Sequence, residues 1–114
     1  MPRRAWRLRV EDILAPIERI HRYIAGMTYD DFCADERTAD AVIRHIEIIG
    51  EAARHVPSNV QARHLHVPWR HMRDMRNALI HDYADVSLSI AWDTAQHDLP
   101  PLVPLITEML RVEP

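Results

Sequence analysis

The chain has 114 residues, 47% of them hydrophobic, which suffices for one domain with a buried core. A formal net charge of −3 argues against a broad basic surface for nucleic acid, although a small groove with a few arginines remains compatible. All 14 basic residues are arginines and only 2 glycines occur, which excludes a P-loop, lysine Schiff-base chemistry and a glycine-rich phosphate loop.

No apolar run approaches the roughly 18 residues that a membrane span requires, and no signal-peptide pattern is found, so we expect a soluble, cytoplasmic protein. The single cysteine, Cys33, excludes an internal disulfide and a zinc site built from several cysteines. We expect Cys33 to be a small buried hydrophobic residue. No metal ion or other cofactor is expected.

An arginine cluster opens the chain, either as a frayed, solvated end or as a contact surface for RNA or a partner; it comprises Arg3, Arg4, Arg7 and Arg9. A first amphipathic helix is predicted from about Leu8 to Ala25, because apolar residues recur there every three or four positions. They are Ile13, Ile17, Ile20 and Ile24, followed by Met27. Pro16 should kink this helix or mark its first turn, and Gly26 should end it.

Thr28 can cap a short helical turn, and Asp35 can cap the long helix that follows. The long helix is predicted from about Asp35 to Val56, since the four-three apolar spacing returns there before Pro57 stops it. Gly50 in its interior costs about 1 kcal/mol relative to alanine, so we expect it to permit close approach of another helix.

Glu47 and Glu51 lie four residues apart on this helix and face the same way. Together with Arg44 and Arg54 they fit a salt-bridged, exposed face, which spacing alone favours. The polar connection of residues 57 to 67 should contain about one helical turn. Its two histidines, His64 and His66, lack a third ligand and therefore do not make a metal site.

The next helix is predicted to open at Pro68, with an apolar seam at Trp69, Met72 and Leu79. Arg76 and Tyr83 fall in the same heptad register as this seam, which is unusual for a plain core. One interpretation is structural: Arg76 pairs with a carboxylate of the bundle, while His81 and Tyr83 cap the helix end.

The other interpretation is chemical, because Arg76, Asn77, His81 and Tyr83 together suit phosphate chemistry. Arg76 can neutralise charge on phosphate oxygens with a planar fork of donors, and His81 can exchange a proton near neutral pH. On a regular helix Asn77 and His81 share a face, whereas Arg76 lies about 140° from His81. The set therefore converges only if the helix loosens around His81 or if a second chain of a two-fold dimer supplies part of it.

Ser87 can cap a further helix, Leu99-Pro100-Pro101 should break or bend it, and a last helix carries Leu102 and Ile106. No strand pattern of useful length is found. We expect an all-α, antiparallel up-and-down bundle of four main helices with one or two short ones, forming a single domain over residues 1–114.

The segment from Arg76 to Tyr83, Arg-Asn-Ala-Leu-Ile-His-Asp-Tyr, resembles the Arg-x4-His-x-Tyr motif of HEPN-domain ribonucleases. It is most similar to that of HepT toxins, the partners of MNT-type nucleotidyltransferase antitoxins. The resemblance extends to three further places: Glu47-Ile48-Ile49-Gly50-Glu51-Ala52, Val67-Pro68-Trp69-Arg70, and Trp92 with Leu99-Pro100.

The resemblance implies a HEPN-like homodimer whose motif helices meet in a cleft, and a metal-independent endoribonuclease toxin of a type VII toxin-antitoxin pair. Arg76 would stabilise the charge that develops when an RNA 2′-hydroxyl attacks the adjacent phosphate. His81 would be the general base or acid, and Asn77 would position the substrate or the imidazole.

In the family, the nucleotidyltransferase transfers AMP onto the motif tyrosine, here Tyr83, which would add bulk and negative charge and repel RNA. The family also places the Glu-x-x-Gly-Glu-Ala segment beside the motif helix, so Glu47 or Glu51 could orient Arg76 or His81. Two alternatives stay open: a non-catalytic helical binding module that pairs with a nucleotidyltransferase, and a nucleotide-binding accessory role.

Overall fold

The computed structural model describes residues 3–79 and 87–112, and these two ranges contain helices but no strands. The four long helices are α1 (Arg3–Ile24), α3 (Glu36–Arg54), α5 (Trp69–Leu79) and α7 (Leu102–Val112). The short helices are α2 (Tyr29–Ala34), α4 (Ser58–Arg63) and α6 (Leu88–Asp93), and α6 continues into a π-helical segment, η1 (Thr94–Asp98). The predicted all-α bundle with four main helices is confirmed. None of the helices in the described ranges is both long and apolar enough to cross a membrane.

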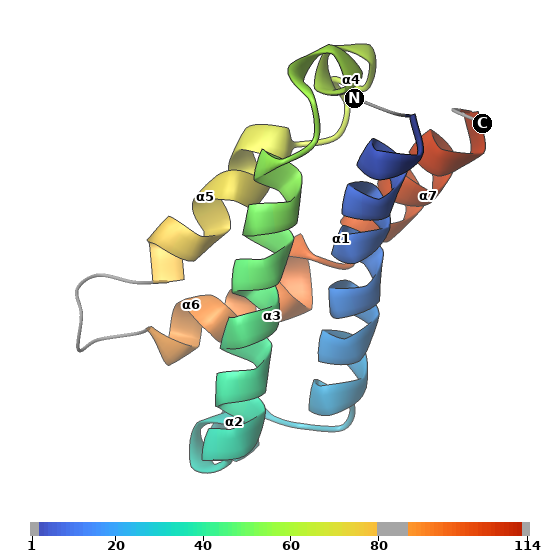
Figure 1. Cartoon of the computed structure of the whole chain (residues 1–114). Helices are drawn as coiled ribbons and strands as arrows, with labels where there is room; N and C mark the ends of the chain where they lie inside the picture. The colour runs from blue at the N-terminus through green and yellow to red at the C-terminus, as the bar shows by residue number, and fades with distance from the viewer. Residues whose placement is uncertain (1–2, 80–86, 113–114) are drawn as a thin grey trace.

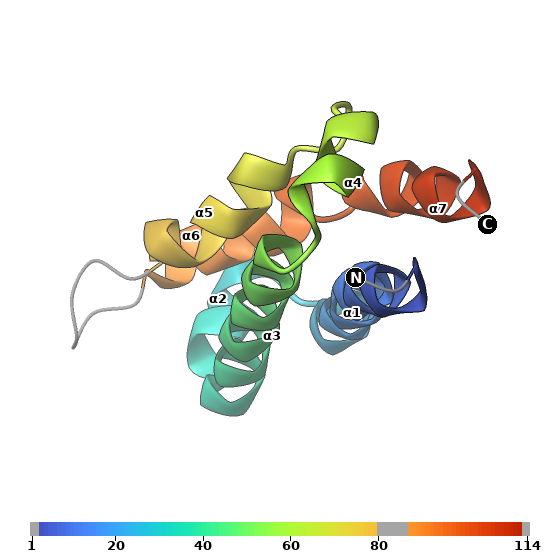
Figure 2. The same cartoon turned by 45° about the horizontal axis from the view of Figure 1, so that its top comes forward.

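The two longest helices, α1 and α3, lie side by side and run in opposite directions (Figure 1). α5 and α6 pack against α3, and α7 lies along the amino-terminal part of α1 (Figure 2). The interior consists mainly of apolar side chains. Those that are fully buried include Val10, Ile13, Ile20, Val42, Ile46 and Ile49. In this layout α5 lies at the edge of the bundle, so one of its faces is buried and the other remains open to solvent.

α1 begins earlier than predicted, at Arg3 rather than Leu8. Trp6 and Val10 extend the buried apolar stripe toward the amino terminus, at 4% and 0% exposure. Arg7 donates from its guanidinium to the backbone carbonyl of Leu110 on α7 at 3.2 Å, so this part of the arginine cluster is tied to the bundle. Pro16 lies inside the helix, which rules out the predicted alternative that it marks the first turn.

The turns between α1 and α3 form as their sequence predicts. Gly26 follows α1 with φ of 78°, a left-handed conformation that glycine adopts readily. Thr28 and Asp31 form a reciprocal capping box at the start of α2. Asp35 caps α3, and hydrogen bonds from the backbone N–H and the side-chain hydroxyl of Thr38 hold the pKa of Asp35 below its usual value.

The prediction that Cys33 is buried is wrong, because its side chain is exposed. The preceding residue, Phe32, is fully buried and packs against Trp92 with ring centroids 5.2 Å apart. Successive helical residues point about 100° apart. In the six-residue helix α2 the inward position belongs to Phe32, and the next residue therefore faces outward.

α5 begins directly after Pro68, as predicted. Its first residue, Trp69, is 5% exposed and donates its indole N–H to the backbone carbonyl of His64 at 3.0 Å, which anchors the start of α5 to the connection that follows α4. At the start of α6 the predicted cap is confirmed, since the hydroxyl of Ser87 accepts from the N–H of Ile90 at 3.2 Å.

Candidate active site

Arg76 and Asn77 lie in the last turns of α5 with exposed side chains. The buried face of this helix consists of Trp69, Met72, Met75 and Leu79. This face differs from the predicted seam, because Met75 rather than Arg76 continues it between Met72 and Leu79. Arg76 stands at the edge of the buried face, where its backbone is packed and its guanidinium reaches solvent.

The approach of α3 to α5 is set at Gly50. A β-carbon at this position would lie 3.2 Å from the carbonyl oxygen of Met72, 3.7 Å from that of Arg73 and 3.9 Å from the β-carbon of Arg76. The first distance is shorter than ordinary van der Waals contact, so any side chain here would push α5 outward. The predicted close approach at Gly50 is confirmed, and it brings the backbone of Met72 and Arg73 and the β-carbon of Arg76 against α3.

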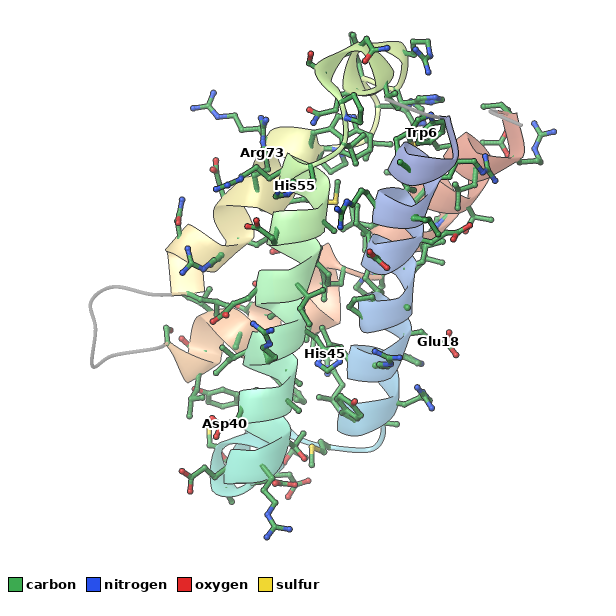
Figure 3. All side chains as sticks on the ribbon, in the orientation of Figure 1. Trp6, Glu18, Asp40, His45, His55 and Arg73 are labelled. Carbon is green, nitrogen blue, oxygen red and sulfur yellow. The ribbon has the colours of Figure 1, made fainter. Side chains whose placement is uncertain are left out.

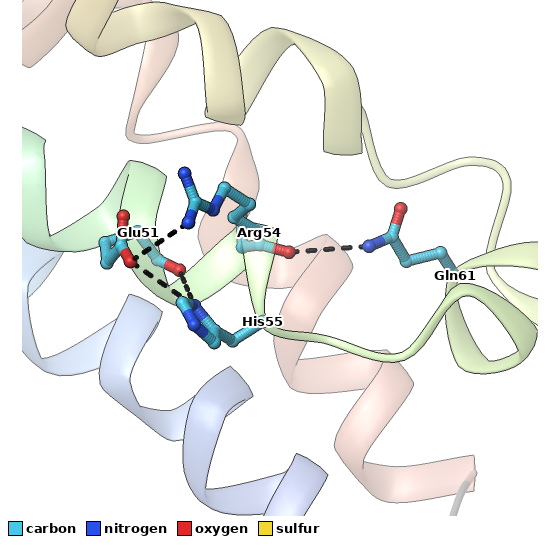
Figure 4. A network of polar contacts seen from close by, with 5 residues as sticks. Glu51, Arg54, His55 and Gln61 are labelled. Carbon is cyan, nitrogen blue, oxygen red and sulfur yellow. Dashed lines mark hydrogen bonds and ion pairs between the residues drawn. The ribbon is translucent and has the colours of Figure 1, made fainter.

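The carboxylates of α3 form ion pairs within their own helix. Glu51 lies 3.9 Å from Arg54 and 3.5 Å from the ring of His55 (Figure 4), and Glu47 lies 3.7 Å from Arg44. Within residues 3–79 and 87–112, no ion pair joins either carboxylate to Arg76. The salt-bridged face predicted from the spacing is therefore present.

Glu47 and Glu51 nevertheless differ in how far their side chains are exposed. Glu47 lies three residues before Gly50, and its side chain is 28% exposed; together with Glu51 it lines a groove that also contains Arg9 and Asp12 of α1. The side chain of Glu51 is 59% exposed and is held by the end of its own helix.

Leu79 and Ser87 bracket the segment of residues 80–86, and the backbone N–H of Ser87 donates to the carbonyl of Leu79 at 3.0 Å. This hydrogen bond joins the start of α6 to the carboxyl end of α5, next to the turn that carries Arg76 and Asn77. His81 and Tyr83 belong to residues 80–86 and lie outside the described residues. Their convergence with Arg76 and Asn77 stays a prediction.

Three arginines follow one another at three-residue intervals along α5, and Figure 3 labels the middle one, Arg73. Arg70 lies 3.8 Å from Asp74, whereas Arg73 and Arg76 are exposed like charges on neighbouring turns. Such pairs destabilise a helix by about 0.2–0.5 kcal/mol. Our sequence interpretation singled out Arg76 and missed Arg73, although the regular spacing of the three arginines was a usable signal.

The histidines of the polar connection pack against each other. His64 is 5% exposed, and its ring centroid lies 5.9 Å from that of His66 in an edge-on contact. In the described part of the chain, no group of three or more histidine, cysteine or carboxylate side chains is arranged to hold a metal ion.

Comparison with protein families matches residues 13–109 to the family described as ribonuclease HepT-like. The matched range covers most of the chain and includes the segments around Gly50 and Arg76.

Several individual relatives are similar over most of their own length. A protein of Thermococcus cleftensis named "Probable ribonuclease HepT" is 41% identical over 93 residues, which covers 82% of this chain and 84% of the relative. A protein of Caldanaerobacter subterraneus, described as a candidate RNase, is 35% identical and covers 91% of this chain and 93% of its own. A third, from Methanocaldococcus jannaschii and also described as a candidate RNase, is 34% identical, with coverage of 97% and 92%. Comparison with solved structures found no match.

Proposed function

The chain belongs to the ribonuclease HepT-like family, and from this premise we propose that it is the endoribonuclease toxin of a type VII toxin-antitoxin pair. One observation carries the proposal. The family match spans the whole stretch from Glu47 to Tyr83, and within it Gly50 holds the base of Arg76 against α3 at the exposed edge of the bundle.

In the proposed reaction the 2′-oxygen of RNA attacks the adjacent phosphorus, and the bond from phosphorus to the 5′-oxygen breaks. The products are a 2′,3′-cyclic phosphate and a 5′-hydroxyl. His81 takes the proton of the attacking hydroxyl or returns one to the leaving oxygen. Arg76 donates hydrogen bonds to the non-bridging oxygens, where negative charge grows, and Asn77 positions the substrate or the imidazole. No step requires a metal ion.

We propose that the active form is a homodimer. One imidazole cannot act as base and acid in the same step, and a two-fold axis would supply a second copy of His81 to a shared cleft. Activity per chain should then fall upon dilution, in step with the loss of dimer measured by light scattering. Undiminished activity from a monomer would contradict this part of the proposal.

Tyr83 is the proposed off switch. The phenolic oxygen attacks the α-phosphorus of ATP bound to the cognate nucleotidyltransferase, pyrophosphate leaves, and Tyr83 carries AMP. The added negative charge and bulk repel RNA from the neighbouring arginines. Intact mass spectrometry should show the mass of one adenylyl group only after co-expression with the nucleotidyltransferase, and Tyr83→Phe should abolish that addition.

Glu47 is proposed to support Arg76, with Glu51 in a weaker role. A carboxylate beside a guanidinium would restrict its rotamers and direct it toward the cleft. Glu47→Gln should lower kcat by about tenfold or less, far below the effect of losing Arg76 itself, with little change in KM.

The defining experiment measures cleavage of single-stranded RNA by purified protein in excess EDTA. Wild type should cleave, His81→Ala should lose about 10²-fold or more in rate, and Arg76→Gln should lose a similar factor. Arg22→Gln, an exposed substitution in the last turn of α1, is the matched control and should cleave normally. Unfolding curves of all variants should coincide closely. Protein that binds a nucleotidyltransferase yet never cleaves RNA would instead support the non-catalytic binding module.

A further inference from the structure

A groove of about 730 Å³ lies between α4, the connection that follows it and the first two turns of α5. Its lining combines apolar and polar side chains, among them Gln61, Leu65, Trp69, Arg70 and Arg73. The groove is shallow and open to solvent. The groove is separate from the turn of α5 that carries Arg76 and Asn77, but it lies on the same helix.

Leu65 is the most unusual side chain of this groove, because it is a large hydrophobic residue that is 81% exposed. Of its two neighbours, His64 is buried and His66 is exposed. Trp69 also lines the groove; it is 5% exposed, and its indole N–H donates to the backbone carbonyl of His64, which fixes its position. In the groove, Leu65 thus offers an apolar surface open to solvent, and Trp69 provides a rigid side. A flat apolar group can lie against them.

Arg73 gives the groove its unbalanced positive charge. Arg70 and Asp74 also line it, but they lie 3.8 Å apart and largely offset each other. Arg73 precedes Arg76 by three residues, a rise of about 4.5 Å along the helix. A phosphate bound at Arg73 would therefore be a neighbour, along the same strand, of a phosphate bound at Arg76.

We propose that this groove is a subsite for the nucleotide next to the scissile phosphate, with Arg73 binding its phosphate and Leu65 covering its base. This inference rests on the proposed ribonuclease function. An RNA strand would run along α5 from Arg76 to Arg73 and then into the groove. Arg73 is a positioning residue in this scheme.

The subsite selects single-stranded RNA. A base can lie against Leu65 only if it is unstacked and unpaired, and proteins that bind single strands typically hold unpaired bases by packing them on side chains, most often aromatic ones. Duplex RNA would present only its backbone to Arg73. The groove therefore explains how a chain with a net negative charge could hold RNA at a small site rather than on a broad basic face.

The test uses the His81→Ala protein, which should bind RNA without cutting it, and end-labelled single-stranded RNA in a fluorescence anisotropy titration at several salt concentrations. Adding Arg73→Gln should weaken binding by about threefold to tenfold and reduce the slope of log affinity against log salt by about 1. Leu65→Ala should weaken binding to the single strand by about threefold without changing that slope, and should leave duplex binding unaltered. Arg22→Gln removes the same charge elsewhere and should change neither quantity.

Catalysis provides a second readout in protein that retains His81. Arg73→Gln should raise KM for a single-stranded substrate while kcat is retained, whereas Arg76→Gln should lower kcat. A purely structural role of Arg73 would not produce this separation.

The two proposals fail in different ways. If the parent protein binds RNA and Arg73→Gln changes neither affinity nor salt slope, the groove assignment is overturned while the ribonuclease stands. If neither the parent binds nor the wild type cleaves RNA, both are overturned. If Leu65→Ala or Arg73→Gln changes the oligomeric state in light scattering and leaves RNA binding intact, the groove is an interface between chains and the RNA assignment is overturned.

Discussion

Gly50→Ala tests the contact on which the position of Arg76 depends. Two opposing contributions set the change in the free energy of unfolding that this substitution causes. Alanine is the better helix former by about 1 kcal/mol, which favours the variant. The new β-carbon would lie 3.2 Å from the backbone carbonyl of Met72, and a backbone atom cannot swing aside as a flexible side chain can.

α5 must therefore shift outward by a few tenths of an ångström. Overpacking of this kind costs about 1–3 kcal/mol, which exceeds the gain in helix propensity. We expect a net loss of about 1 kcal/mol, measured as a decrease in Tm of about 4 °C in thermal unfolding followed by circular dichroism.

The same shift should impair cleavage, because Arg76 moves with α5. Since a displacement of about 1 Å can cost a hundredfold in rate, a shift of a few tenths should lower kcat by about twofold to tenfold. The assay is RNA cleavage at a temperature well below the Tm of the variant, so that loss of folded protein does not contribute.

Gly26→Ala is the matched control. Nothing lies within 4 Å of a β-carbon at Gly26, but its φ of 78° disfavours alanine, at a cost of about 1–2 kcal/mol. Both variants should therefore lose stability, while only Gly50→Ala should lose activity. A Gly50→Ala protein that is more stable than wild type and fully active would refute the argument that this contact positions Arg76.

Three further predictions concern the framework. Asp35→Ala should be less stable than wild type at neutral pH. Because folding lowers the pKa of Asp35, the difference in stability between the two proteins should be fully present above about pH 4 and should shrink as the pH falls below that value. Unfolding measured over a series of acidic pH values tests this. Trp69→Phe should lose about 1–2 kcal/mol in urea unfolding, because the carbonyl of His64 loses the indole donor; an unchanged midpoint would show that this hydrogen bond is dispensable. Glu108→Gln should leave Tm unchanged within about 1 °C despite short hydrogen bonds to Arg111, since both side chains are solvated; a larger decrease would contradict this assignment.

Much of the framework followed from local signals in the sequence. The helix caps at Thr28, Asp35 and Ser87 are each determined by one side chain and a nearby backbone N–H, so they could be predicted without tertiary information. Gly50 was equally informative. A glycine inside a helix lowers the stability of that helix, so its presence indicates that a neighbouring helix lies too close for a side chain.

The predictions of burial for Cys33 and of the buried seam at Arg76 were wrong because burial there depends on the position of each residue around its helix. Cys33 is exposed because Phe32 takes the single inward position of a short helix, and residue type alone does not distinguish two adjacent apolar residues. Arg76 lies beside the buried face rather than in it, because the 3.6-residue period drifts from a heptad and brings Met75 inward.

The candidate site was only partly accessible from the sequence, since it depends on contacts between elements. The Arg76-to-Tyr83 motif could be recognised, and the resemblance to the HepT family led us to expect the Glu47-to-Ala52 segment of α3 beside the helix that carries the motif. The groove that Leu65 and Arg73 share could not be predicted, because it forms where the connection after α4 meets the start of α5. Nothing local in either segment specifies that contact.

The most direct measurement on the proposed ribonuclease is the chemistry of the ends that it leaves on RNA. A defined single-stranded RNA is cut in the presence of EDTA, and the fragments are identified by mass spectrometry. Attack by the 2′-hydroxyl at a site formed by Arg76 and His81 predicts a 2′,3′-cyclic phosphate on one fragment and a 5′-hydroxyl on the other. Fragments that carry a 3′-hydroxyl and a 5′-phosphate, or cleavage that appears only when a divalent metal ion is added, would contradict the account.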